Sequence, residues 1–209
     1  MDKGLYHAIF SNDIDLCRKL IEKGENVNLR ARDDATVLHK AIFYNQKIIC
    51  SILIHNGADI NAIRNDGATP LHVAVLCGDI DIVNLLLNNN SKINTRNNDG
   101  HTPLYIAILS GKIDIARLLI EKGADINLRD TNGNTYLHIA VSCDKIEMVE
   151  LLLKYKANVN ARANDEKTPL YRAICSQNMD ICRVLIKNEA NIDENTNKLY
   201  KLCEQFRFL

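Results

Sequence analysis

The apolar positions of this chain recur with a fixed long period. TVLH, TPLH, TPLY, TYLH and TPLY begin at residues 36, 69, 102, 135 and 168, each 33 residues after the one before. One period earlier, KGLYHAI begins at residue 3 and fills the same pattern. A period of roughly 20 to 50 residues indicates stacked supersecondary units, each too small to bury its apolar face alone. We therefore expect six units, at about 1–30, 31–63, 64–96, 97–129, 130–162 and 163–195.

Two repeat columns, meaning sets of positions spaced 33 residues apart, support this register. Leucine stands two residues after each motif start, at Leu5, Leu38, Leu71, Leu104, Leu137 and Leu170. Alanine follows three residues later, at Ala8, Ala41, Ala74, Ala107, Ala140 and Ala173. Six matches in each column make a chance pattern untenable.

Each unit is predicted to form two short helices joined by turns, as the unit at 64–96 illustrates. Thr69 suits an N-cap, and Pro70 suits the first helical position, where its missing N–H costs nothing. Gly78 is expected to end this first helix. A second amphipathic helix is predicted over about 81–88, and Asn65-Asp66-Gly67 predicts a tight turn between units.

These motifs resemble the ankyrin repeat, most closely in RNDGATPLHVAVLCGDIDIVNLLL and GKIDIARLLIEKGADIN. The resemblance covers essentially the whole chain. It implies an all-α solenoid of stacked antiparallel helix pairs with β-hairpin-like fingers, forming a single domain over 1–209. The tail adds apolar residues at helical spacing, which predict a capping helix over 196–209.

Several positions depart from the repeat pattern. Non-glycine residues stand where the pattern has a turn-forming or helix-ending glycine, including Asp34, Gln177, Lys156 and Glu189. If the left-handed backbone persists at Lys156 and Glu189, each costs about 1 kcal/mol. Ile48 occupies a column that is acidic in other units, so we expect it to be exposed.

Composition and charge narrow the function. Formal net charge is zero, which gives no electrostatic signal for nucleic acid. No apolar run reaches the roughly 18 residues of a membrane span. Seven cysteines lie scattered without a CxxC pair, so we expect a reduced, cytoplasmic protein. We also expect the protein to be monomeric and to need no cofactor.

The histidines of the motif do not behave as catalytic groups. His39, His72 and His138 occupy a position that is tyrosine in the three other units, at Tyr6, Tyr105 and Tyr171. A catalytic or metal-binding role would not survive that exchange within one chain. In ankyrin repeats this side chain bonds between units, and tyrosine can partly replace it. We therefore predict a protein without enzymatic activity.

Two polar columns leave alternatives open. Asn28, Asn61, Asn94, Asn127 and Asn160 precede the fingers, and we expect them to bond the turn backbone. The resemblance adds that such asparagines can be hydroxylated. Arg30, Arg96, Arg129 and Arg162 form a basic column in the fingers. Nearby aspartates favour a solvated, mixed-charge ribbon over a ladder for an acidic partner.

The most informative column lies at the end of the first helix of each unit. It is apolar in the first four units and then changes to Ser142 and Cys175. One interpretation is packing against the next finger; the other is an apolar surface for a partner, since ankyrin repeats bind through inner-helix ends and finger tips. The candidate partner-binding residues are Phe10, Phe43, Tyr44, Leu76, Leu109, Arg32, Asp66 and His101.

The sequence therefore predicts a protein–protein interaction module. Alternatives are a structural scaffold or assembly module, or a pathogen effector directed at a host protein. The last alternative rests on units such as TPLYIAI and LHKAI, which resemble ankyrin proteins of large DNA viruses and intracellular bacteria. The host cytoplasm would then be the location.

Overall fold

A computed structural model describes residues 4–193 and 196 of the chain. The described part forms twelve helices joined by turns. It separates into two compact units, Met1–Ala107 with Glu121–Ala124, and Ile108–Ile120 with Asp125–Leu209. From here on, these are called the first and the second unit, and each 33-residue stretch is called a repeat. The helices are α1 (Gly4–Phe10), α2 (Ile14–Glu22), α3 (Val37–Phe43), α4 (Lys47–His55), α5 (Pro70–Cys77), α6 (Ile80–Asn88), α7 (Pro103–Leu109), α8 (Ile113–Glu121), α9 (Tyr136–Ser142), α10 (Ile146–Lys154), α11 (Pro169–Cys175) and α12 (Met179–Lys187).

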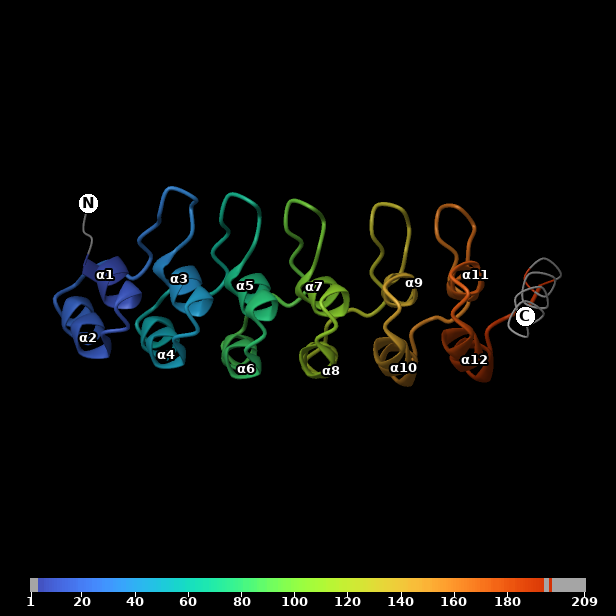
Figure 1. Ribbon diagram of the computed structural model, residues 1–209. Coiled ribbons are helices and arrows are strands. Elements are labelled where there is room, and N and C mark those ends of the chain that lie inside the picture. Colours follow the sequence, from blue (N-terminus) through green and yellow to red (C-terminus); the bar gives the residue numbers. More distant parts are fainter. Residues whose placement is uncertain (1–3, 194–195, 197–209) are drawn as a thin grey trace. The chain divides into compact units, whose positions relative to one another are not determined.

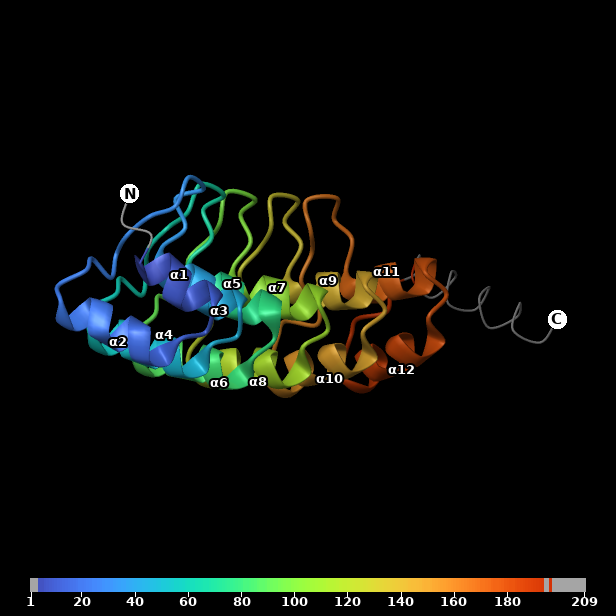
Figure 2. The same ribbon diagram turned by 60° about the vertical axis from the view of Figure 1, so that its left-hand side comes forward.

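In the first unit, three helix pairs stack in sequence order. Helices α1, α3 and α5 form one layer, and α2, α4 and α6 form the other, as Figures 1 and 2 show. Each inner helix contacts its own outer partner, and α3 contacts both α1 and α5. In the second unit α9 packs on α10 and α11, and α12 packs on α10 and α11. The predicted all-α class with stacked helix pairs is confirmed.

The helix boundaries follow from the residues predicted to make them. Thr69 caps α5 with an extended backbone, and Pro70 takes the first helical position. Helix α5 ends at Gly78, whose φ of 88° is the left-handed conformation that glycine adopts without strain. The Asp79 side chain then accepts from the backbone amides of Asp81 and Ile82 and begins α6.

Fingers connect the pairs and rise from the inner-helix layer in each unit (Figure 1). Isolated antiparallel bridges close two of them, between Arg30 and Thr36 and between Arg129 and Thr135. Neighbouring fingers also bond to each other in the first unit, where the Asn65 amide donates to the Asp33 carbonyl at 3.2 Å. The described residues contain no longer strand, so the fingers are hairpin-like rather than a sheet.

The glycine replacements keep the left-handed backbone. Lys156 has φ of 63° and Glu189 has φ of 66°. Glu166 and Gln177, also in the second unit, have φ of 60° and 57°. Each such residue costs about 1 kcal/mol relative to glycine, because its Cβ crowds the following carbonyl. The expected strain at Lys156 and Glu189 is therefore present.

Burial separates the cysteines into two groups, and the expected exposure of Ile48 is confirmed. Cys17, Cys50 and Cys182 are buried as small apolar side chains, while Cys77 and Cys175 are exposed. Ile48 is 55% exposed, and its neighbour Lys47 forms an ion pair with Asp81. No described helix has the length and apolarity that a membrane crossing requires.

Two predictions about organisation are not tested by the structure. The capping helix proposed over 196–209 lies outside the described residues apart from Thr196, which is buried. A single domain over 1–209 also stays a prediction.

Candidate functional site

The motif histidines form joints between successive repeats. The His39 Nε2 atom lies 3.3 Å from the Ala68 carbonyl, 29 residues later in the next finger. His72 reaches the His101 carbonyl at 3.0 Å, also 29 residues later. In the same way the Tyr6 hydroxyl donates to the Ala35 carbonyl at 3.1 Å. Tyrosine therefore makes the equivalent bond, and the predicted structural role is confirmed.

Hydrogen bonding fixes the protonation of these histidines. The Thr36 backbone amide donates to the His39 Nδ1 atom at 3.2 Å, so that nitrogen is an acceptor. The Nε2 atom then carries the proton that it donates to a carbonyl. His72 and His138 have the same two contacts. Burial lowers the pKa of all three histidines, and that of His39 falls to about 4.

The column at the inner-helix ends is exposed in the first unit. Phe10 is 74% exposed at the end of α1, and Phe43 is 64% exposed at the end of α3. Leu76, near the end of α5, is 60% exposed. Packing against the next finger would have buried these side chains, so the packing interpretation is wrong for this unit. Three large apolar side chains on successive inner helices remain open to solvent.

Tyr44, just after α3, makes one aromatic contact with the end of α1 and one with its neighbour Phe43. The Tyr44 ring meets the Phe10 ring edge-to-face, with centroids 5.9 Å apart and an interplanar angle of 90°. The same ring meets Phe43 at 5.4 Å and 79°. This geometry is a favoured one for aromatic pairs. We call Phe10, Phe43 and Tyr44 the aromatic cluster.

A cavity of about 1020 Å³ adjoins the aromatic cluster. It lies between α1, α3 and the first leg of the finger at 30–36, and Phe10 and Tyr44 are part of its wall. Arg32, from the finger, also lines it. Pockets of this size take small molecules or a few side chains of a peptide. The structure thus brings together three of the predicted site residues around one hollow.

The comparison with known families decides the identity. Residues 5–97, 63–130 and 124–197 match the family model described as Ankyrin repeats (3 copies). The chain belongs to the ankyrin repeat family. No curated protein matches its sequence. Ankyrin repeats are generally protein–protein interaction modules, and the family is generally non-catalytic.

The asparagine column of these ankyrin repeats bridges neighbouring repeats. The Asn28 side chain accepts from the Asp59 amide at 2.6 Å and donates to the Gly57 carbonyl at 3.1 Å. Asn160 contacts Asn191 and Glu189 in the same manner. The expected bonding to the turn backbone is confirmed, and it engages both ends of the amide.

The arginines of the basic column stay partly exposed and also bond carbonyl groups of the fingers. Arg30 donates to the Ile63 carbonyl at 2.8 Å, and Arg129 donates to the Arg162 carbonyl at 2.6 Å, each 33 residues away. Arg96 donates to the Gly100 carbonyl of its own finger at 2.8 Å. The predicted mixed-charge ribbon agrees with the exposed ion pairs that Arg30 forms with Asp34 and Arg162 forms with Glu166. The additional bonds to finger carbonyls form because the guanidinium N–H groups reach acceptors on both legs.

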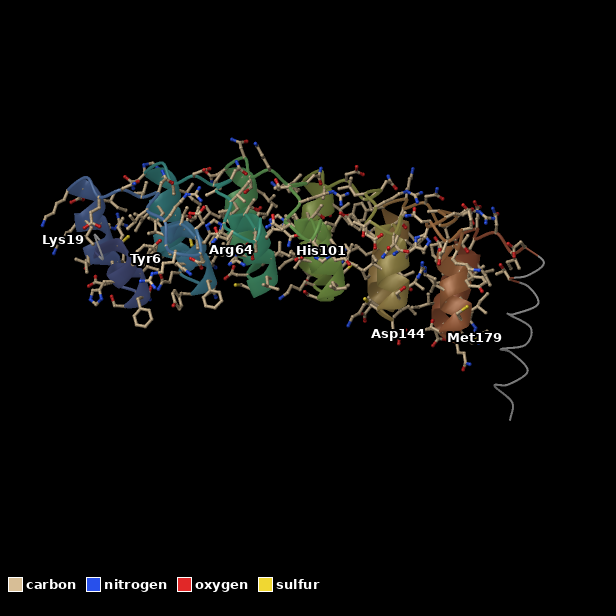
Figure 3. The ribbon with its side chains drawn as sticks, turned by 90° about the horizontal axis from the view of Figure 1, so that it is seen from above. Tyr6, Lys19, Arg64, His101, Asp144 and Met179 are labelled. Carbon is tan, nitrogen blue, oxygen red and sulfur yellow. The ribbon has the colours of Figure 1, made fainter. Side chains whose placement is uncertain are left out.

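The remaining predicted site residues lie apart from the cavity wall. The Asp66 carboxylate pairs with Arg64, which holds its pKa to about 2. The His101 ring stacks on Tyr105 with centroids 4.1 Å apart. Leu109 is exposed and belongs to the second unit. Figure 3 labels Tyr6, Arg64 and His101 on successive parts of the first unit.

Several cavity residues are absent from the sequence-based prediction. Tyr6, Ile9, Leu29 and Lys40 also line the cavity, and none of them is among the predicted partner-binding residues. His7 and Lys40 share one repeat column, and they precede Phe10 and Tyr44 by about one helical turn. That spacing is the signal that could have found them. Among the described residues, no group of three or more His, Cys, Asp and Glu could hold a metal ion.

Proposed function

We propose that this ankyrin repeat protein binds a partner protein on the inner-helix ends of its first unit. The supporting observation is the exposure of Phe10, Phe43 and Leu76, which follow one another on α1, α3 and α5. Large apolar side chains that gather on a solvent-exposed protein surface mark interaction sites, because their burial on binding removes apolar surface from water. A monomeric state and a cytoplasmic location remain predictions.

The first unit also provides the features of an interface core. Aromatic side chains are enriched among residues that dominate binding energy, and Tyr44 places a phenol between two phenylalanine rings. The adjoining cavity gives a partner side chain a hollow to enter. The backbone beneath is held by the bonds between repeats, so little conformational entropy is lost on binding.

Alanine at Phe43 and Leu76 is expected to abolish partner capture while leaving the fold intact. Both side chains are mostly exposed, so their removal leaves no cavity in the core. The measurement is affinity capture from candidate lysates with wild type and the Phe43→Ala/Leu76→Ala variant, each checked by thermal melting of its helical signal.

The matched control removes two exposed isoleucines from the outer helices. Ile48 on α4 and Ile80 on α6 are 55% and 42% exposed, so Ile48→Ala/Ile80→Ala also deletes two large apolar groups from the surface. Capture retained by the control but lost by the first variant supports the proposed face. The proposed face is rejected if both variants capture the partner to the same extent. It is also rejected if the Phe43→Ala/Leu76→Ala variant loses its cooperative melting transition.

A further inference from the structure

The cavity of the first unit has an uneven distribution of charge. Its described lining contains three cations, Arg30, Arg32 and Lys40, and no carboxylate side chain. Most of the remaining lining is apolar or aromatic, including Phe10 and Tyr44. A cationic rim around an apolar hollow attracts a ligand that carries both a negative charge and an apolar group.

Two of the three cations already have partners. Arg30 pairs with Asp34 at 3.3 Å, and Lys40 pairs with Asp33 at 2.9 Å. Arg32 forms no ion pair with any residue in the described part of the chain, and it is exposed. The cation that a ligand's carboxylate would meet is therefore Arg32.

The backbone of Arg32 offers a second contact. In the next two fingers, the amides of Asn65 and Asn98 donate to the preceding finger, to the Asp33 carbonyl at 3.2 Å and the Asp66 carbonyl at 3.0 Å. Arg32 holds the equivalent position one period earlier. Its amide donates to no residue within 4–193 or to Thr196. An extended peptide beside this finger would supply the carbonyl acceptor, as in recognition by strand addition.

We propose that this cavity binds an extended acidic peptide segment of the partner. An aromatic or large aliphatic side chain enters between Phe10 and Tyr44, and an adjacent aspartate or glutamate pairs with the Arg32 guanidinium. A peptide carbonyl accepts from the Arg32 amide. This inference rests on the proposed function and specifies the chemistry of the segment that occupies one end of the binding face.

Selection of peptides from a random displayed library tests the proposal without knowledge of the partner. The full chain is immobilised, and the recovered sequences are compared with the unselected library. We expect enrichment of peptides in which a carboxylate lies beside an aromatic or large aliphatic residue. No enrichment, or enrichment of basic or purely polar peptides, would overturn the proposal.

Charge reversal then locates the bound peptide. The Arg32→Glu variant should bind the selected peptide about tenfold more weakly or worse, because attraction becomes repulsion. A copy of the peptide with lysine in place of its acidic residues should bind Arg32→Glu better than wild type. Lys19→Glu makes the same change of charge on α2, outside the cavity lining, and should bind as wild type does.

Further outcomes separate the competing explanations. If Lys19→Glu weakens binding as much as Arg32→Glu, the attraction is a property of net charge and the proposal is wrong. It is also wrong if a single-stranded oligonucleotide displaces the peptide as well as the unlabelled peptide does. Loss of capture by Phe43→Ala/Leu76→Ala without acidic peptides in the selection would leave the proposed function standing and reject this inference alone. If peptide binding depends on Arg32 but the Phe43→Ala/Leu76→Ala variant still captures its partner, the proposed binding face is rejected. The proposal that the cavity binds an acidic peptide then stands.

Discussion

Acidification from pH 6.5 to pH 4 is expected to lower the free energy of unfolding by about 3 kcal/mol through His39 alone. His39 has a pKa of about 4 in the folded state, compared with 6.5 for the free side chain. The unfolded chain therefore binds more protons across this window. The stability contributed by neutral His39 is complete above pH 6.5 and is lost as pH falls towards 4.

The hydrogen bonds explain why the folded state resists protonation. A proton on the His39 Nδ1 atom would face the amide of Thr36, which donates to that nitrogen at 3.2 Å. Burial is the main cause of the lowered pKa, and the nearby Arg64 and Arg30 lower it further, while the Ala68 carbonyl and Asp66 oppose them. The pKa values of His72 and His138 are lowered in the same direction, so the total loss should exceed that from His39.

Urea unfolding at several pH values measures this loss, with the helical circular dichroism as the signal. The control is the triple variant His39→Tyr/His72→Tyr/His138→Tyr, because the Tyr6 hydroxyl bonds the equivalent carbonyl, that of Ala35, in its own repeat. Its stability should change little between pH 6.5 and 4, whatever its value at neutral pH. Asp66, whose pKa is held to about 2 by Arg64, loses its contribution only below about pH 3.8 and does not disturb the window. A wild type that is equally stable at pH 6.5 and 4 would contradict the account.

Leu71→Ala is expected to lower the free energy of unfolding by about 3 kcal/mol. Leu71 is fully buried on α5, a helix that packs against both α3 and α6. The substitution loses the transfer free energy of the removed methyl groups and leaves a cavity in a stack of neighbouring repeats. Because whole domains are stable by only about 5 to 15 kcal/mol, the loss should be evident in a urea titration.

Leu76→Ala provides the matched control on the same helix. It makes the same chemical change five residues later, where the side chain is mostly exposed. The helix propensities are altered equally, so the difference between the two variants reports burial alone. Leu76→Ala should unfold within about 0.5 kcal/mol of wild type. Equal destabilisation by both variants would mean that Leu76 is covered by a neighbouring segment.

Much of the fold is predictable because each repeat has the same pattern of residues and therefore the same local structure. The exchange of His39 for Tyr6 could be interpreted from the two residues' places in one column, and both side chains bond a carbonyl 29 residues later. The left-handed backbone at Lys156 was likewise expected from glycine in the equivalent positions. A repeat column specifies an environment that several units share, so packing and capping follow from it.

The candidate site could be predicted only in part. The column through Phe10 and Phe43 located large apolar residues, but a column does not reveal whether the next finger covers them. The cavity was not predicted because its wall combines residues from two helices and a finger, and only His7 and Lys40 among them share a repeat column. The arginine contacts were also missed, since sequence shows the charge of Arg30 but not which carbonyl its fork reaches. Each failure concerns a contact that depends on the particular side chains of neighbouring repeats, which the shared repeat pattern does not specify.

Carbene footprinting of the captured complex tests the central claim most directly, because it reports which side chains a partner covers. We expect labelling of Phe10, Phe43, Tyr44 and Leu76 to fall when the partner is bound. Labelling of the exposed outer-helix residues Ile48 and Ile80 should stay as in the unbound protein. Protection of Ile48 and Ile80 with the aromatic cluster still fully labelled would place the binding face on the outer helices and contradict the account.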